Sequence, residues 1–407
     1  MDFQFKIPER ELWINKITTE LKENSDRINY KNEIEEIEFD ISAVANNSYS
    51  SVDQRSFNEW KNCFKIDVQD EVLANQACLK ALMLGADSLF LVIHGSKTHW
   101  FKLFHGIQFE YIYTRIIISN GDERSSLDKF LKDNGISNVD IFIDPITDVT
   151  HEIKLRNFLL NGFELQQIGA NTWQEIGILL SSFHELIIKD LIDSKFNFHL
   201  GIGSNYFVEI AKIRAIKWLC KHLCNLYQIN LEINFSGEVG FMNKSLNDPH
   251  TNLLRQTTEA MSAISGGISE ITIRAYDDLS VKGSTDFSRR MALNVSNLLK
   301  EESYFDFVKD PLKGSNILEF LTEQIISKAW TYFKQLEQFE SINDLDKIEF
   351  IRKSISETRK RRLENFEKKK MELIGINCFM NPQNEPNSWL NNETYLEMSY
   401  FIFETCQ

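Results

Sequence analysis

The residues with the clearest chemical potential lie in the stretch FNFHLGIGSNYFVEIAKIRAIKW, from Phe196 to Trp218. His199 lies in an apolar alternation typical of a buried strand, two glycines follow it, and Asn205 begins a segment with helical spacing. The end of such a strand is where a barrel enzyme places its chemistry, and glycines before a helix N-terminus can bind an anion. The glycine pair does not match G-x-G-x-x-G, so this unit alone indicates no reaction.

Other motifs do not support a chemical role. Cys220 and Cys224 share one face of a predicted helix, but His222 points the other way, so the three cannot hold one metal ion and we interpret the cysteines as core or surface residues. The basic run RKRRLENFEKKK from Arg359 is interleaved with glutamates, which is typical of a solvated helix face. The sequence contains no GxxxxGK[ST], which argues against a nucleotide hydrolase.

Composition places the chain among acidic globular proteins. Its 407 residues are 43% hydrophobic and 12% aromatic and carry a formal net charge of −14. This charge argues against a general nucleic-acid binder, which must neutralise phosphates. The cysteines are scattered, the N-terminus resembles no signal peptide, and the apolar runs are far shorter than the ~20 residues that span a bilayer. We therefore predict a reduced, cytoplasmic protein that binds neither membrane nor metal.

Strand-like runs recur along the chain and alternate with helical segments. The predicted strands are Ala86–Ile93, Tyr111–Ile118, Val139–Ile143, Phe163–Ile168, Phe196–Leu200, Leu231–Phe235, Ile271–Ala275 and Phe305–Val308. Helix starts are predicted at Asp70, at Ser126, at Thr172 with Glu175 as a capping box, and at Asp248 with Pro249 in the first helical position. Eight such repeats predict an α/β fold, a (β/α)8 TIM barrel, with a doubly wound open sheet as the alternative.

The chain divides into three predicted parts. Residues 1–69 hold a short amphipathic helix at 11–23 and scattered aromatic side chains, which indicates an arm that wraps its own barrel or a partner. Residues 70–380 form the barrel and a C-terminal helical extension, with long helices at 315–339 and 344–373 and a short strand in IGINCFMNP from Ile374. Residues 381–407 form a tail that is too short for another domain.

Several stretches together resemble the methylmalonyl-CoA mutase family. The resemblance covers roughly residues 60–379, in order and at the expected spacing. The matching stretches are IDVQDEVLANQACLKALMLGADSLFL from Ile66, NYFVEIAKIRAIKWL from Asn205, DPHTNLLRQTTEAMSAISGG from Asp248, DFSRRMALNVSNLLKEES from Asp286, DPLKGSNILEFLTEQIISKAW from Asp310 and IGINCF from Ile374. The resemblance implies the same eight-stranded barrel as the alternation of strands and helices.

The resemblance also implies a chemistry. Enzymes of this family use adenosylcobalamin, whose cobalt–carbon bond breaks homolytically to start a radical migration of a thioester group between adjacent carbons. They hold coenzyme A in a long barrel channel and cobalamin in a second domain that carries the motif DxHxxG. Here the sequence ends after IGINCF, and DPHTNL from Asp248 has Leu253 where that motif has glycine. We therefore expect no cofactor on this chain and adenosylcobalamin on a partner.

The barrel departs from the catalytic pattern of the family. No RQYAGF-like stretch occurs between residues 47 and 65, and NFSGEVG from Asn234 lacks the histidine of the HSQTSG-like strand end. Where catalytic chains read YHxQEAGA, this chain reads FELQQIGA, with Glu164 in place of the histidine. Loss of such polar groups removes transition-state stabilisation, so we expect no catalytic residue. The vestigial candidates at the barrel mouth are Arg115, Gln166, His199 and Asn205.

These features predict the small, non-catalytic subunit of a heterodimeric mutase of this family. The resemblance implies that such a chain stabilises a large, catalytic subunit, and that the complex is an isomerase, an intramolecular transferase that interconverts methylmalonyl-CoA and succinyl-CoA in propionate metabolism. Two alternatives remain open. The chain could be the substrate-binding barrel of a split acyl-CoA mutase with a separate cobalamin-domain subunit, or a non-catalytic module that binds acyl-CoA.

Overall fold

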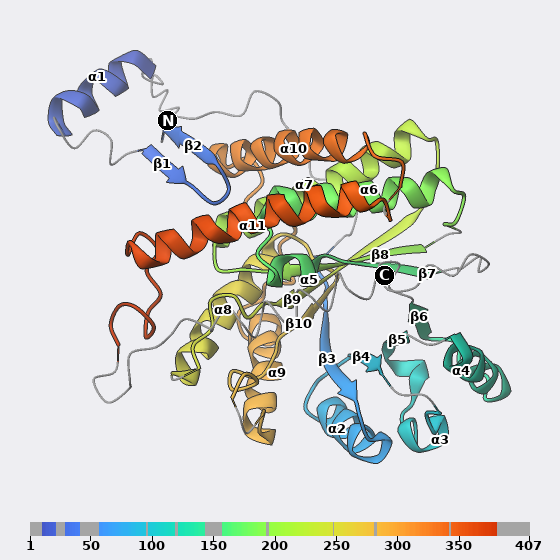
Figure 1. The fold of residues 1–407 in the computed structure, drawn as a ribbon. Helices are drawn as coiled ribbons and strands as arrows, with labels where there is room; N and C mark the ends of the chain where they lie inside the picture. The colour runs from blue at the N-terminus through green and yellow to red at the C-terminus, as the bar shows by residue number, and fades with distance from the viewer. Residues whose placement is uncertain are drawn as a thin grey trace, which may run out of the picture.

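Eight parallel strands form one curved sheet at the centre of the molecule (Figure 1). The computed structural model describes residues 10–21, 29–40, 57–94, 97–118, 121–142, 157–192, 195–246, 248–280, 283–341 and 343–380. The strands are β3 (Lys61–Val68), β4 (Ser88–Ile93), β5 (Tyr113–Ile118), β6 (Val139–Phe142), β7 (Asn157–Asn161), β8 (Lys195–Ile202), β9 (Glu232–Val239) and β10 (Glu270–Thr272). Their order is β6-β5-β4-β3-β10-β9-β8-β7, and the end strands β6 and β7 contact each other. The predicted (β/α)8 barrel is therefore confirmed in a nearly closed form.

The curvature brings distant strands around a shared interior. Cys63 on β3, Phe90 on β4, Phe142 on β6 and Leu159 on β7 pack in one buried cluster. Because the last two side chains come from opposite ends of the strand order, the sheet must curl back on itself.

Helices cover the outside of the sheet. Those that follow the strands are α2 (Glu71–Met83), α3 (Trp100–Leu103), α4 (Gly121–Asp133), α6 (Thr172–Ile188), α7 (Tyr206–Leu226), α8 (Pro249–Ser265) and α9 (Asp286–Glu301), with short turns at α5 (Gly162–Gln167) and η2 (Phe109–Tyr111). Helix α10 (Asn316–Leu336) packs across α6 and α7, and α11 (Leu345–Glu367) follows it. None of the helices among the described residues is long and apolar enough to cross a membrane.

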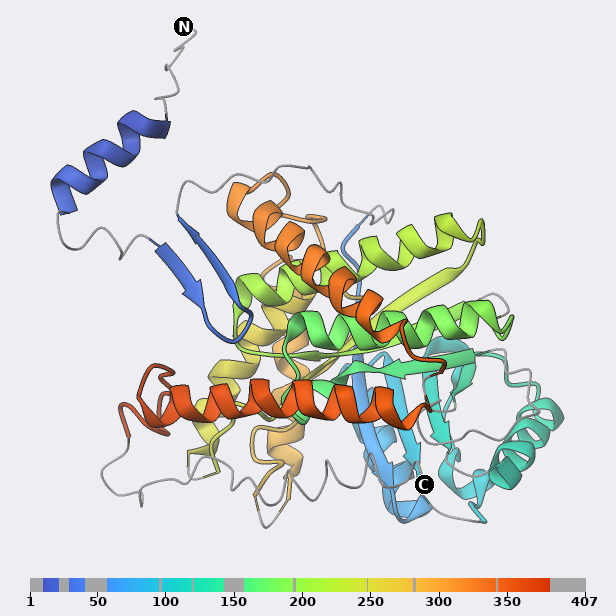
Figure 2. The ribbon, with the colours of Figure 1, turned by 45° about the horizontal axis from the view of Figure 1, so that its top comes forward.

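The N-terminal segment contributes a helix and a hairpin. Helix α1 (Arg10–Leu21) lies apart from the barrel, whereas the antiparallel hairpin of β1 (Asn29–Asn32) and β2 (Ile37–Asp40) lies beside the helices of the barrel (Figure 2). Phe39 of the hairpin contacts Phe320 on α10, with ring centroids 5.4 Å apart. The hairpin is thus a part of the arm that packs on its own barrel.

Three predicted helix starts agree with the structure and two do not. Asp70 caps α2 by accepting a hydrogen bond from the Leu73 N–H. Asn205 caps α7 by accepting a hydrogen bond from the Val208 N–H, and Asp248 precedes α8 with proline at the first helical position. The predicted capping box at Thr172 is shifted by one residue, because Asn171 caps α6 and pairs with Gln174. The start predicted at Ser126 is wrong, since α4 begins at Gly121.

Two predicted strands are wrong and two strands of the barrel were missed. Phe163–Ile168 falls on the helix α5 and the turn after it, because a short, fully buried apolar run fits a helix as well as a strand. Phe305–Val308 forms turns in which Phe307 is 70% exposed. The missed strands of the barrel are β3 and β7. The predicted count of eight is therefore correct only because two wrongly predicted strands offset two missed ones. Of the short strand predicted from Ile374, the structure has only an isolated bridge to Cys378.

The sheet also begins earlier than predicted. Strand β3 starts at Lys61, inside the segment of residues 1–69 that was expected to be an arm. It forms parallel ladders with β4 and β10, so it is an integral barrel strand. The predicted tail of residues 381–407 lies outside the described residues.

Candidate functional site

A network of buried charged side chains fills the barrel interior. Arg115 on β5 donates from Nη1 to Ser236 Oγ on β9 over 2.8 Å and forms an ion pair with Glu270 on β10. Its guanidinium also lies 4.3 Å from the centre of the Phe90 ring. The Arg115 side chain is only 1% exposed, so these contacts replace water around its charge.

His199 on β8 contacts the same serine from the other side. Its Nδ1 lies 2.9 Å from Ser236 Oγ, and its Nε2 lies 2.9 Å from Glu238 Oε2. Burial lowers the pKa of His199 to about 4, so the ring is neutral at pH 7. A neutral ring can donate from Nε2 to the carboxylate while Nδ1 accepts from the serine hydroxyl, which satisfies both nitrogens.

Glu238 is the centre of this network. It accepts from Lys65 Nζ over 2.8 Å and forms an ion pair with Arg274, which also pairs with Asp278 at 3.1 Å. Burial alone would raise the pKa of Glu238, but Arg274 and Lys65 hold it well below its usual range. The carboxylate is therefore ionised and fully partnered, and it is not available as a general base.

Aromatic rings cover the charged network. The Arg274 guanidinium lies 4.8 Å from the centre of the Phe241 ring and 5.7 Å from that of Phe163. Lys65 Nζ lies 5.1 Å from the Phe163 ring and equally far from Phe90. Paired charges and aromatic rings thus occupy the space that a ligand along the barrel axis would need.

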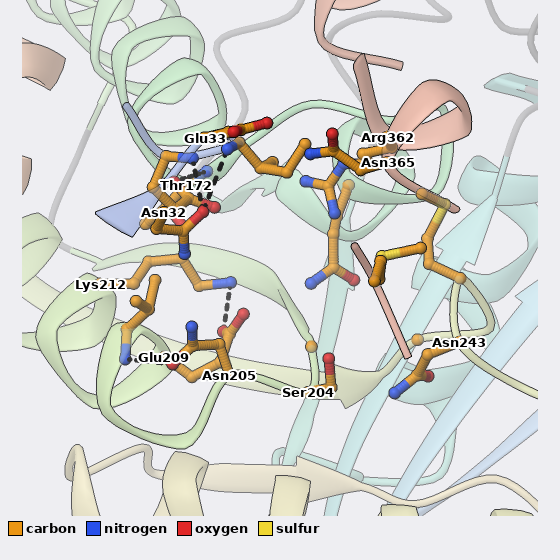
Figure 3. Close-up of a pocket in the computed structure, with 18 of the residues that line it drawn as sticks. Asn32, Glu33, Thr172, Ser204, Asn205, Glu209, Lys212, Asn243, Arg362 and Asn365 are labelled. Carbon is orange, nitrogen blue, oxygen red and sulfur yellow. Dashed lines mark hydrogen bonds and ion pairs between the residues drawn. The ribbon is translucent and has the colours of Figure 1, made fainter. Parts of the chain in front are cut away.

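A second polar region lies under the hairpin. A cavity of about 620 Å³ opens at the carboxyl ends of β8 and β9, between the hairpin, α7 and the end of α11 (Figure 3). Gln166, Asn205, Asn243 and Arg362 line it. Asn205 also donates from Nδ2 to the hydroxyl of Tyr30 in the hairpin over 2.9 Å.

The four residues predicted at the barrel mouth therefore fall in two places. Arg115 and His199 lie inside the barrel, joined through Ser236, whereas Gln166 and Asn205 line the cavity under the hairpin. They do not converge on one point. Their status as remnants of a catalytic site stays a prediction.

Sequence reasoning missed a buried charged cluster at this cavity. Lys212 on α7 lies 3.2 Å from Glu175 on α6 and 2.6 Å from Glu209 on its own helix. Burial raises the pKa of Glu175 to about 7, although Lys212 opposes the shift. The signal in the sequence was the polar pair Glu209 and Lys212 within the otherwise apolar stretch VEIAKI from Val208, because such residues at i,i+3 share a helix face.

The hairpin is bound to the N-terminus of α6. The buried Glu35 accepts a hydrogen bond from the Thr172 N–H over 3.0 Å. Asn171 donates to the Ile34 carbonyl over 2.9 Å, and Trp173 donates from its ring to the Glu35 carbonyl over 3.2 Å. A carboxylate at a helix N-terminus is favourable, so this contact fixes the hairpin over the cavity.

The basic run at the end of α11 also contacts the hairpin. Arg361 pairs with Glu36, and Lys370 Nζ lies 2.8 Å from Glu33. These two side chains remain partly exposed, which agrees with the prediction of a solvated helix face, although each also pairs with a glutamate. The run holds an acidic hairpin of the same chain.

The cysteine and histidine motif on α7 has a packing role. Cys220 and Cys224 are buried, whereas the His222 ring stacks on Trp218 with centroids 5.0 Å apart. In the described part of the chain, no three His, Cys, Asp or Glu side chains are grouped so that they could hold a metal ion.

The partial cobalamin-type motif from Asp248 does not fit a cobalt ligand. Its His250 lies in the first turn of α8 and packs against the Tyr276 ring, with centroids 5.3 Å apart. The segment is thus a helix start with its histidine against a ring, and not a loop that presents a histidine.

Comparisons with known proteins agree on the family to which the chain is similar. The family model described as methylmalonyl-CoA mutase matches residues 140–397. The chain is 30% identical to the methylmalonyl-CoA mutase small subunit of Porphyromonas gingivalis, over 93% of this chain and 71% of that protein.

Matches to longer relatives cover less of each chain. The methylmalonyl-CoA mutase large subunit of Porphyromonas gingivalis is 25% identical over 57% of this chain and 34% of its own length. The methylmalonyl-CoA mutase of Rhizobium meliloti is 26% identical over the same shares. The chain thus spans about a third of these two relatives. With most of it matched by the family model and by the small subunit, the chain belongs to the methylmalonyl-CoA mutase family.

Proposed function

We propose that this chain is a non-catalytic small subunit of an adenosylcobalamin-dependent methylmalonyl-CoA mutase. The observation that carries the proposal is the filled barrel interior. There Glu238 binds Lys65, His199 and Arg274, and Phe163 and Phe241 lie over these charges. A chain that turned over an acyl-CoA along this axis would have to break several buried ion pairs, each costly to separate.

The proposed partner is a large subunit that supplies the chemistry. The relatives from Porphyromonas gingivalis include both a small and a large subunit, which supports a heterodimer. In this proposal the cytoplasmic complex is an isomerase that interconverts methylmalonyl-CoA and succinyl-CoA, and the large subunit holds the cobalamin. The small subunit contributes stability to its partner.

The test is coexpression with the large subunit from the same organism. We expect the two chains to co-elute, and the large subunit to be soluble or active only when this chain is present. Each chain alone is the control. If no complex forms and this chain isomerises an acyl-CoA with an isolated cobalamin domain, the split-mutase alternative replaces the proposal.

A second candidate function is the binding of acyl-CoA without turnover. A separate cavity of about 420 Å³ at the carboxyl ends of β3 and β10 favours it, because Arg289 lines this cavity and can face a phosphate group. Lys65 and Arg274 also line it, but both are already paired with Glu238. Saturable thermal stabilisation of the isolated chain by acetyl-CoA would support this function. The stabilising-subunit proposal expects none.

A further inference from the structure

We propose that the cavity under the hairpin is a binding site for a small organic carboxylate, with Arg362 as its charged anchor. The cavity of about 620 Å³ has the size of a small-molecule site. The inference concerns the isolated chain and is independent of the proposed heterodimer.

Arg362 stands out among the cations that line this cavity. Lys212 pairs with Glu175 and Glu209, Lys370 with Glu33, and Lys31 with Glu38. Within the part of the chain that the structure describes, Arg362 alone of the lining cations has no carboxylate in ion-pair contact.

The immediate contacts of Arg362 leave donors unused. Its Nη2 donates to the Ala170 carbonyl over 3.2 Å, while its buried Nε finds no hydrogen-bond partner among the described residues. Burial lowers the pKa of Arg362, with only longer-range opposition from Glu35 and Glu209. A buried donor without a partner is costly, and a bound carboxylate would satisfy this Nε and pair with the guanidinium through parallel hydrogen bonds.

Further donors lie around the same space. Gln166 is 9% exposed, and in the described structure its Nε2 has no acceptor, because its only hydrogen bond is through Oε1 to Gln167. Ser204 and Asn205 line the cavity where the 21-residue helix α7 begins, so the positive end of the helix dipole faces a bound anion.

The carboxylates that line the cavity do not oppose this assignment. Glu33 pairs with Lys370, the two buried glutamates Glu175 and Glu209 share Lys212, and Glu35 accepts from the α6 backbone. The remaining one, Glu372, is exposed at the rim. Because only one lining cation is unpaired, the site matches a carboxylate better than the higher charge of a phosphate.

The experiment titrates the purified chain with acetate, citrate and inorganic phosphate at matched ionic strength, by calorimetry and thermal unfolding. We expect saturable 1:1 binding of a carboxylate and no saturable effect of phosphate. Arg362→Met should weaken carboxylate binding at least tenfold. Lys360→Gln removes an exposed positive charge on the same helix that does not line the cavity, and it should leave the affinity unchanged.

A second variant protects the test against misfolding of Arg362→Met. Gln166→Met removes an uncharged donor together with the acceptor for Gln167, and we expect it to weaken carboxylate binding severalfold with the chain still folded. The proposal is overturned if neither carboxylate binds saturably, if phosphate binds as well as the carboxylates, or if both cavity variants bind like the Lys360→Gln control.

Discussion

His199 illustrates how a histidine at a barrel strand can be structural. Its two ring nitrogens are occupied by Ser236 and Glu238, and its side chain is fully buried. The position on a strand was predicted from the sequence, but these partners lie 37 and 39 residues away on β9. No local pattern contains that pairing, so the chemistry of the residue depends on strands that only the fold brings together.

Burial of neutral His199 makes stability depend on pH. The pKa of His199 is about 4 in the folded chain and 6.5 as a free residue, so between these values the unfolded state binds more protons and stability falls as pH falls. We expect His199→Gln to lose this dependence, up to about 1.4 kcal/mol per pH unit. Urea unfolding of both proteins from pH 4 to 7 measures the difference.

Glu175 has the opposite effect on the pH dependence of stability. The contribution of His199 must therefore be measured by comparing the variant with the wild type. Its pKa is raised to about 7, so between 4.5 and 7 the folded state binds more protons and stability rises as pH falls. The two effects partly cancel in the wild type. The control is His105→Gln at an exposed histidine, which should keep the wild-type profile. A profile of His199→Gln that equals the wild type would contradict a neutral buried ring.

At the scale of elements, one buried carboxylate is the charged contact of the hairpin that solvent screens least. Glu35 contacts the N-terminus of α6, whereas the ion pairs of Glu33 and Glu36 with α11 are largely exposed. Exposed pairs contribute little, commonly below about 1 kcal/mol, and salt screens them. The buried contact therefore contributes more than these ion pairs, together with the hydrogen bonds from Asn171 and Trp173 and the packing of Phe39 on Phe320.

Removal of that contact should release the hairpin and leave the barrel intact. We expect Glu35→Ala to cost about 1–3 kcal/mol of local stability, because the Thr172 N–H loses its acceptor. Hydrogen exchange of residues 29–40 should quicken while β8 and β9 keep their protection. Glu38→Ala, which removes an exposed carboxylate of β2, serves as the control. Faster exchange throughout the barrel would argue against a separable hairpin.

The two missed strands of the barrel show why this barrel can be predicted only in part from its sequence. In β3, Lys61 and Lys65 alternate with apolar residues, which suggests a solvent-exposed face, yet Lys65 points to Glu238 inside the barrel. In β7, the run NFLLN is short and flanked by polar residues. In most barrels the side chains that point inward are apolar, whereas here several of them are polar. The residues that pair with these polar side chains are unknown until the fold is known. The β8 unit and the start of α7 were predictable because the face of β8 that packs on the surrounding helices is apolar, with Phe196 and Phe198 against Phe183 of α6.

At the scale of the whole molecule, the barrel has one weak junction. Strands β6 and β7 end the strand order, so each has a ladder on one side only within the described structure, whereas β8 and β9 are paired on both sides. Backbone groups with one ladder open more readily than those held on both sides.

Hydrogen exchange should locate this junction. We expect amides of Val139–Phe142 in β6 to exchange at least tenfold faster than those of Phe196–Leu200 in β8, under conditions where the chain stays folded. Mass spectrometry of peptic fragments resolves the two strands. Equal protection would mean that the barrel closes as tightly between β6 and β7 as elsewhere.

The filled barrel axis also limits how the chain can evolve. Lys65, His199 and Arg274 all contact Glu238, so the loss of Glu238 would leave buried cationic and imidazole groups without this partner, and the loss of one of the three would remove one contact of the carboxylate. A histidine introduced at Glu164 would therefore not open the axis, and each single step toward an open channel would first lower stability. Because these residues depend on one another, several of them would have to change together before an open channel could form.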